Sequence, residues 1–199
     1  MFRIISLLIG YCLGLFQTAY IVGRLNGIDI RHHGSKNAGF TNTNRVLGRK
    51  MGIIVFVADI FKAIIAFIVA SLIFDGEYAL YAGLYAGLGA ILGHVFPFYL
   101  KFKGGKGVSS TLGLIMMLDW RIAIISFALG LLAVVITRYI SVASLLITLS
   151  VPIIMIFFNY PPEVMALAWA LAAFVWFLHR ANIMRLATGQ ENKFSLKKK

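Results

Sequence analysis

Long apolar runs are the feature that most limits what this chain can fold into. A helix needs roughly 20 apolar residues to cross the hydrocarbon core of a bilayer. Six runs approach or exceed that length: 4–22, 51–73, 79–100, 121–137, 140–158 and 163–178. Hydrophobic residues make up 60% of the chain, well above the roughly 45–50% of a soluble domain. We therefore predict an all-α integral membrane protein that forms a single polytopic domain over residues 1–199.

Two segments decide the number of spans. Residues 107–118 are apolar but too short for a comfortable crossing, so we expect a tilted or partial helix shielded by its neighbours. Residues 4–22 share the apolar character of a signal peptide, but the run is long and no small-x-small cleavage site follows it cleanly. We interpret it as a retained first span. With residues 107–118 the count is about seven transmembrane helices; without them it is six, or five if neighbouring runs are merged, and the loop charges favour seven.

Positive charge is concentrated in three segments between or after the apolar runs. The chain has 19 Lys and Arg against 7 Asp and Glu, a net charge of +12. Fifteen of these cations lie in loops 23–50 and 100–107 and in the segment after Leu178, which ends in Lys197–Lys199. That distribution argues against a nucleic-acid partner, which would call for one basic face. The positive-inside rule instead places all three segments in the cytoplasm, with the N-terminus outside and the C-terminus inside. We expect the final lysines to touch anionic headgroups.

Within the first cationic segment, residues 34–45 are rich in glycine, hydroxyl and amide residues. Gly34 and Gly39 permit positive φ angles and close backbone approach, and backbone N–H groups in such turns form anion-binding nests. We expect Arg45 to grip a phosphate with two hydrogen bonds. Further donors to an oxyanion are Ser35, Asn37, Thr41 and Asn42. An ordinary polar loop is the alternative, but the positive-inside rule accounts only for Lys and Arg.

The second segment contains Gly93-His94 and then the run Phe102–Gly107, in which three glycines surround Lys106. The residues from Val108 onward look helical, so the glycines precede a helix N-terminus, which is a natural seat for phosphate. The GxxxxGK[ST] spacing is absent, so we infer no nucleotide. A flexible membrane turn is the alternative, and His94 beside aromatic residues is typical of interfacial packing.

The third segment, His179–Glu191, follows the last apolar run. If the helix continues past Leu178, then His179 and Asn182 share one face with either Arg185 or Leu186. A histidine at a membrane surface beside cations can serve in acid–base chemistry or contact a phosphate. The alternative is an interfacial anchor.

Three polar residues inside the apolar runs have open interpretations. Asp59 and Lys62 are three residues apart, so they share a helix face, and charges within a span usually point inward. They form either a self-neutralising structural pair or a polar support beneath an active site. Ser144 follows the turn at Arg138 and either faces the same site or makes a helix–helix hydrogen bond.

Several kinds of chemistry have no signature in this sequence. It lacks the H-x₄-D pair of soluble acyl-CoA acyltransferases, a G-x-S-x-G elbow and a clustered Cys/His site. The adjacent His32 and His33 suit chelation poorly, so we expect no metal and no cofactor. Chemistry here would depend on hydroxyls, amides, cations and one histidine.

Together, the three segments resemble the signatures of the bacterial acyl-phosphate:glycerol-3-phosphate acyltransferase family (PlsY). That family carries GS-x-N-x-G-x-TN-x-x-R, GH-x-FP…FKGGKG and HR-x-NI-x-RL-x-x-G-x-E, and all three occur here in order. The resemblance covers essentially the whole chain. Two departures are mild: Lys36 stands where the family usually has glycine, and Leu178 where arginine is frequent.

The resemblance implies a multi-pass enzyme of the bacterial inner membrane, with its active site on the cytoplasmic side. It would move an acyl chain from acyl phosphate to the sn-1 hydroxyl of glycerol 3-phosphate, releasing lysophosphatidic acid and phosphate. Its partners would be these two substrates and membrane lipid. Acyl-CoA as the donor is one alternative, and a transporter for organophosphates is another.

Under this hypothesis the candidate residues have the following roles. The residues that hold glycerol 3-phosphate and orient its hydroxyl are Ser35, Arg45, Lys106, His179 and Asn182. The donor phosphate meets the backbone amides of Gly104, Gly105 and Gly107, beside a polar wall of Thr41, Asn42 and Ser144. Further substrate-binding positions are Gly34, Asn37, Gly39 and Lys103, and Glu191 fixes the third segment by pairing with a cation. The base is His179 or a substrate phosphate, and Ser35 as a nucleophile is a further alternative.

Overall fold

The computed structural model describes residues 1–194, and every regular element in that range is helical. The lysines Lys197–Lys199, expected at the membrane surface, lie outside the described residues. The chain divides into two compact units, Met1–Leu118 and Asp119–Lys199.

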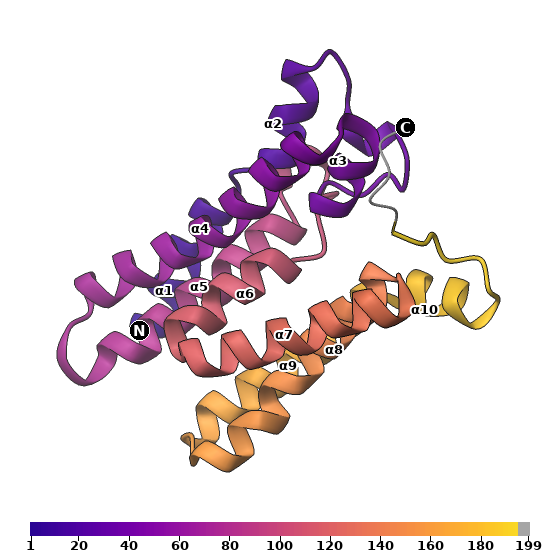
Figure 1. Ribbon diagram of the computed structural model, residues 1–199. Helices are drawn as coiled ribbons and strands as arrows, with labels where there is room; N and C mark the ends of the chain where they lie inside the picture. Colours follow the sequence, from indigo (N-terminus) through magenta and orange to yellow (C-terminus); the bar gives the residue numbers. More distant parts are fainter. Residues whose placement is uncertain (195–199) are drawn as a thin grey trace. The chain divides into compact units, whose positions relative to one another are not determined.

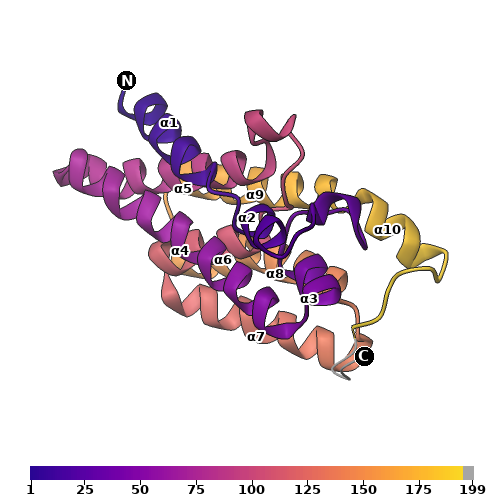
Figure 2. The same ribbon diagram turned by 90° about the horizontal axis from the view of Figure 1, so that it is seen from above.

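The first unit is a helical layer built on its longest apolar runs (Figures 1 and 2). Its α-helices are α1 (Phe2–Gly14), α2 (Thr18–Leu25), α3 (Phe40–Leu47), α4 (Arg49–Ile73), α5 (Ala79–Val95) and α6 (Val108–Leu118). Short 3-10 turns join them: η1 (Ile30–His32), η2 (Gly76–Tyr78) and η3 (Phe98–Leu100). Helix α5 packs against α1, α4 and α6, and α4 also packs against α6.

Small residues allow the helices of the first unit to approach closely. Ala63, Ala66 and Ala70 of α4 are fully buried in one cluster with alanines of α5. Gly10 and Gly14 of α1 lie directly against the α5 backbone, where an added Cβ would collide with it. Close backbone approach of this kind is how membrane helices associate when lipid removes the hydrophobic driving force between them.

The first apolar run, which we expected to form the first span, is not one straight helix. It breaks between α1 and α2, and Gln17 occupies the break with only 1% of its surface exposed. The Gln17 Nε2 group donates to the carbonyls of Gly14 (3.2 Å), Gly93 (3.1 Å) and His94 (3.1 Å). One buried amide therefore ties this break to the end of α5, because carbonyls freed at a helix break need donors.

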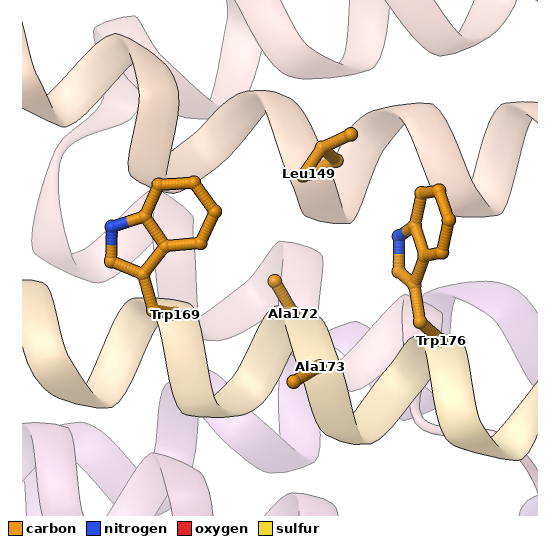
Figure 3. A pocket seen from close by; sticks show the side chains of 5 residues that line it. All are labelled: Leu149, Trp169, Ala172, Ala173 and Trp176. Atoms are coloured by element: carbon orange, nitrogen blue, oxygen red, sulfur yellow. The ribbon is translucent and has the colours of Figure 1, made fainter.

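The second unit contains α7 (Trp120–Thr137), α8 (Ile140–Met155), the 3-10 turn η4 (Ile156–Phe158), α9 (Pro162–Leu178) and α10 (Arg180–Ala187). Helix α8 packs against both α7 and α9. An open recess of about 220 Å³ lies between α8 and α9. Figure 3 shows the rings of Trp169 and Trp176 on either side of two alanines. The recess is almost wholly apolar, so its surface suits hydrocarbon.

Within residues 1–194, five helical segments are long and apolar enough to cross a membrane, or six if the bent pair α9 and α10 is one span. All six expected runs are helical, which confirms the all-α membrane architecture. Within residues 107–118, Val108–Leu118 form the 11-residue helix α6, which is shorter than a full span.

Candidate functional site

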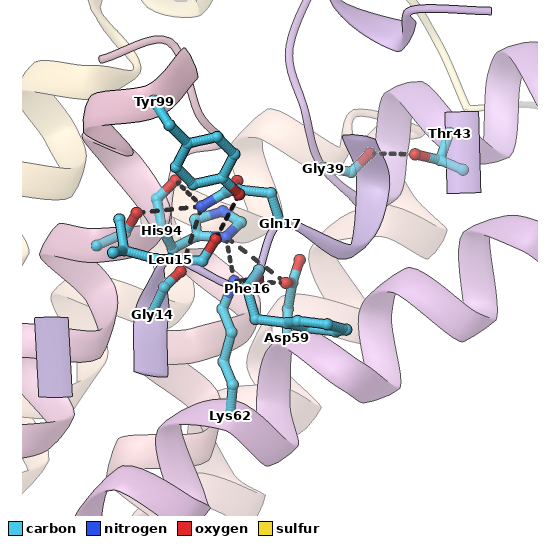
Figure 4. Close-up of polar contacts among 11 residues, drawn as sticks. Gly14, Leu15, Phe16, Gln17, Gly39, Thr43, Asp59, Lys62, His94 and Tyr99 are labelled. Atoms are coloured by element: carbon cyan, nitrogen blue, oxygen red, sulfur yellow. Dashed lines mark hydrogen bonds and ion pairs between the residues drawn. The ribbon is translucent and has the colours of Figure 1, made fainter. Parts of the chain in front are cut away.

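The first segment is more ordered than the loop that we expected over residues 23–50. Helix α3 begins at Phe40, so Thr41, Asn42 and Arg45 lie on a helix. Gly34 has the anticipated positive φ of 57°. The expectation for Gly39 was wrong: its φ of −163° is ordinary extended backbone. Gly39 caps α3, and its carbonyl accepts a 3.1 Å hydrogen bond from the Thr43 hydroxyl (Figure 4).

Asn42 organises this segment from the inside. Its side chain is fully buried, and its Nδ2 group donates to the carbonyls of Ile30 (3.1 Å) and His33 (2.9 Å). Its Oδ1 accepts from the amide of Ser35 at 2.7 Å. Because both N–H groups are already used, Asn42 cannot donate to a substrate oxyanion as we had expected. It holds the turn that presents Ser35.

The exposed rim of the first segment carries the groups available to a ligand. Ser35 and Arg45 are exposed, and Asn37 and Thr41 are half-buried. Among residues 1–194, the side chains of Ser35, Thr41 and Arg45 make no hydrogen bond or ion pair in the structure. A guanidinium and two hydroxyls without partners in this range, on a backbone fixed by Asn42, can bind an anion.

Lys36 has a backbone conformation that L side chains disfavour, with φ = 62°. A left-handed conformation costs a non-glycine residue roughly 1–2 kcal/mol, and the greater freedom of glycine in the unfolded chain offsets roughly half of that. We therefore expect Lys36→Gly to stabilise the protein by about 0.5–1 kcal/mol, measured as a raised Tm. Lys36→Ala is the matched control, since it removes the cation but keeps the unfavourable φ. An equal rise in Tm for both variants would mean that charge, and not backbone conformation, limits stability.

The second segment departs from expectation in how its glycines are used. The amide of Gly104 donates to the Val95 carbonyl and that of Gly105 donates to the His94 carbonyl, both at 3.1 Å. These two N–H groups therefore fold the loop back onto the end of α5, and they do not point at a phosphate as we had predicted. Gly107 has φ = 80° and precedes α6, as expected. Lys103 is exposed and Lys106 is half-buried.

A buried ionic cluster lies beside this loop (Figure 4). The Lys62 Nζ is 2.8 Å from Asp59 Oδ1 and 2.7 Å from His94 Nδ1. The side chains are 2–5% exposed. The sequence predicted that Asp59 and Lys62 would meet, and the structure confirms it. It did not predict His94 as their partner, and the expected interfacial packing of His94 was wrong. The one available signal was the presence of two charges in a span, since they require polar neighbours.

The third segment begins with a sharp bend. Helix α9 ends at Leu178 and α10 starts at Arg180, with 58° between them. The shared face of His179 and Asn182 was predicted on the condition that one helix continues past Leu178. The helix does not continue straight there. The buried His179 places Nδ1 2.8 Å from the Val175 carbonyl. A carbonyl only accepts, so Nδ1 carries a proton, and in the neutral ring Nε2 is the acceptor.

Glu191 connects the two ends of the third segment. Its carboxylate accepts from Asn182 Nδ2 and from Arg185 Nε, each at 2.7 Å. Burial acts to raise the pKa of Glu191, but the hydrogen bonds from Asn182 and Arg185 outweigh it and hold that pKa below its ordinary value. Ser144 of the same unit donates to the Ile140 carbonyl of its own helix at 2.9 Å, so it does not make the helix–helix hydrogen bond that was one of its two expected roles, and its oxygen can still accept from a ligand.

The lowered pKa of Glu191 predicts a pH-dependent contribution to stability. A carboxyl whose pKa is lowered in the folded state stabilises the fold at pH values above its unfolded pKa, which is 4.5 for Glu191. That stabilisation is lost as the pH falls through the folded-state pKa. We expect Glu191→Gln to lower the free energy of unfolding at pH 7 by about 1–2 kcal/mol. The difference from wild type should shrink below about pH 4.5, as thermal unfolding between pH 3 and pH 7 would measure. Glu77→Gln, at an exposed carboxylate, is the control, and an equal loss for both variants would contradict the assignment.

Comparison with known proteins identifies the family. A family model described as glycerol-3-phosphate acyltransferase matches residues 4–189. A glycerol-3-phosphate acyltransferase of Shouchella clausii is 42% identical over 199 residues, which cover 98% of this chain and 97% of the relative. One from Aquifex aeolicus is 36% identical over 186 residues, covering 92% and 95%.

Solved structures agree with the sequence relatives. The crystal structure of PlsY, an integral membrane glycerol 3-phosphate acyltransferase, matches in its glycerol 3-phosphate form with a TM-score of 0.89 and 34% identity, covering 97% of this chain and 96% of that one. Its lysophosphatidic acid form matches with a TM-score of 0.87. This chain belongs to the glycerol-3-phosphate acyltransferase family, and it is an integral membrane acyltransferase of phospholipid synthesis.

Proposed function

We propose that this enzyme transfers an acyl chain from acyl phosphate to the sn-1 hydroxyl of glycerol 3-phosphate. The products are lysophosphatidic acid and inorganic phosphate. The observation that carries the proposal is the rim of Ser35, Thr41 and Arg45, whose side chains have no partner among residues 1–194. The likeness to PlsY structures in glycerol 3-phosphate and lysophosphatidic acid forms supports the acceptor and the lipid product.

Acyl phosphate suits the chemistry that these segments offer. Both substrates carry a phosphate, and the first unit has two glycine-containing cationic segments, around Arg45 and around Lys106. An acyl phosphate is a mixed anhydride with phosphate as a good leaving group, so no covalent enzyme intermediate is needed. Positioning and stabilisation of developing charge are then the main contributions of the protein.

The step is a direct acyl transfer. The sn-1 oxygen attacks the acyl carbon, the bond from that carbon to the bridging phosphate oxygen breaks, and phosphate leaves. The hydroxyl proton passes to Nε2 of His179 or to a substrate phosphate, which titrates near neutrality. Ser35, Arg45, Lys106, His179 and Asn182 remain our candidates for binding glycerol 3-phosphate and orienting its hydroxyl.

The substrate-binding roles of other residues follow from their contacts. Thr41 and Lys103 remain candidates for contact with the donor, together with Gly107. Asn42, Gly104 and Gly105 act through the loop backbones that they hold. Asn37, Gly34 and Gly39 shape the turn before α3, where the amide of Gly39 donates to the Asn37 carbonyl at 3.1 Å. Ser144 completes the polar wall through its remaining acceptor capacity, and Glu191 fixes Asn182 and Arg185.

We further propose that the chain crosses the bacterial inner membrane seven times, with α6 counted as one of the spans and the N-terminus outside. This arrangement places loops 23–50, 100–107 and 179–191 together on the cytoplasmic side, as their cations favour. The apolar recess beside Trp169 and Trp176 would then contact hydrocarbon.

The test is an assay of the purified protein in lipid. Glycerol 3-phosphate is supplied with palmitoyl phosphate and, separately, with palmitoyl-CoA, and the release of phosphate is followed together with lysophosphatidic acid. We expect equal amounts of phosphate and lipid from palmitoyl phosphate alone. The 1-deoxy analogue of glycerol 3-phosphate, which lacks the sn-1 hydroxyl, should give no product. Product from palmitoyl-CoA alone would overturn the donor, and product from the analogue would overturn the sn-1 assignment.

A further inference from the structure

The ammonium of Lys62 is fully satisfied in the interior of the first unit. It has three N–H groups and three acceptors: Asp59 Oδ1 at 2.8 Å, His94 Nδ1 at 2.7 Å and the Phe16 carbonyl at 3.1 Å (Figure 4). Asp59 Oδ1 is also 3.5 Å from His94 Nδ1. These contacts join the break after α1 to α4 and α5.

The cluster determines where His94 carries its proton. An ammonium only donates, so His94 Nδ1 must accept, and the neutral ring has its proton on Nε2. The imidazole is thereby fixed in one tautomer and one orientation, as in sites where a second partner sets the ring of a working histidine.

The other side of His94 supports the glycine-rich loop. Its carbonyl accepts hydrogen bonds from the backbone amide of Gly105 at 3.1 Å and from the side-chain Nε2 of Gln17 at 3.1 Å. Gly105 packs against the ring so closely that an added Cβ would lie 2.7 Å from His94 Cε1 and 2.6 Å from the Ala38 carbonyl. The first and second segments therefore meet at Gly105, directly beside the imidazole.

We propose that Asp59 and Lys62 are positioning residues for acyl transfer, and that they act through His94. By fixing the imidazole they set the position of Gly104 and Gly105, and hence of Lys106, relative to the first segment. This inference rests on the proposed role of Lys106 in binding glycerol 3-phosphate. A buried ion pair is weak evidence for stability, because apolar residues of similar volume often stabilise equally well. The contacts that the His94 ring and carbonyl make with Gly105 connect this ion pair to the candidate site.

The experiment separates positioning from stability with a charge-free replacement. Lys62→Met leaves an unpaired buried carboxylate and is expected to destabilise the fold. The double variant Asp59→Leu/Lys62→Met removes both charges, so it should recover a Tm near that of wild type. It still lacks the donor to His94 Nδ1.

We expect the double variant to raise the KM for glycerol 3-phosphate about 10-fold, with a smaller change in kcat. An effect of about 10-fold is usual for residues that orient the binding residues without touching the ligand. Hydrogen exchange at the amides of Gly104 and Gly105 should be faster by a similar factor. The ¹⁵N shifts of His94 should lose the single-tautomer pattern of wild type. Arg121→Gln, which breaks a 2.7 Å ion pair with Asp119 in the other unit, is the matched control and should change none of these three readouts.

Two outcomes would overturn the inference. One is a double variant with both wild-type KM and wild-type amide exchange, which would make the pair purely structural. The other is faster exchange at the glycines with unchanged KM, which would separate the loop from substrate binding. Exchange and ¹⁵N shifts need no acyl donor, so a wrong donor assignment in the proposed function would leave these readouts intact.

Discussion

Asn42→Ala is expected to abolish most acyl transfer and to lower the Tm sharply. The substitution leaves the Ser35 amide and the carbonyls of Ile30 and His33 without their buried partner. The bond to Ile30 is buried and the other two are partly buried. An unsatisfied buried group costs about 1–3 kcal/mol, so the total loss is on the order of 3 kcal/mol. Ser35 also loses its fixed position, and a misplacement near 1 Å can lower the rate about 100-fold. Thermal unfolding and initial rates measure the two effects.

Two companion variants make this prediction specific. Asn42→Asp keeps the acceptor for the Ser35 amide but loses both donors, so it should also be severely impaired. Asn26→Ala removes a single 2.8 Å hydrogen bond to Val22 at the end of α2, and it should cost about 1 kcal/mol with little effect on turnover. If Asn42→Ala kept the wild-type Tm and only raised KM, Asn42 would be a substrate contact after all.

The fold could be predicted largely because the membrane restricts the options. Apolar runs near 20 residues have to be helices when lipid offers no hydrogen bonds to the backbone, and all six runs are helical. The breaks were not predictable from hydropathy. The break at Gln17 depends on three carbonyl contacts, two of them from a segment 76 and 77 residues away. The bend at His179 likewise follows no glycine or proline signal in the sequence.

The candidate site was predicted at the level of segments but not of individual groups. Residue type shows that a side chain can donate, but not whether the folded backbone already uses the donor. Asn42 and the amides of Gly104 and Gly105 satisfy nearby carbonyls, whereas the side chains of Ser35 and Arg45 have no such partner among residues 1–194. His94 was missed because its contact with Lys62 spans 32 residues, and a single sequence shows no distant contacts.

Arg45→Ala is expected to lower kcat/KM for glycerol 3-phosphate by about 100- to 1000-fold, with the Tm nearly unchanged. Arg45 is exposed in the last turn of α3 and makes no hydrogen bond or ion pair through its side chain with residues 1–194, so its removal breaks no polar contact within that range. Losing one partner of a charged hydrogen-bonded pair with a phosphate typically costs 2–5 kcal/mol. Arg45→Lys should recover only part of this loss, because an ammonium cannot bind phosphate in the planar two-bond geometry.

The control for Arg45 is Arg49→Ala, which makes the same change of net charge four residues further along the chain at the start of α4. General attraction of anions by the basic face depends on total charge and is weakened by salt. A specific phosphate contact depends on which arginine is removed. We therefore expect Arg49→Ala to change kcat/KM less than about 3-fold at 0.15 M salt, and the effect of Arg45→Ala to persist at high salt. Equal losses in the two variants, both vanishing with added salt, would mean that the cationic surface steers substrate without a dedicated arginine contact.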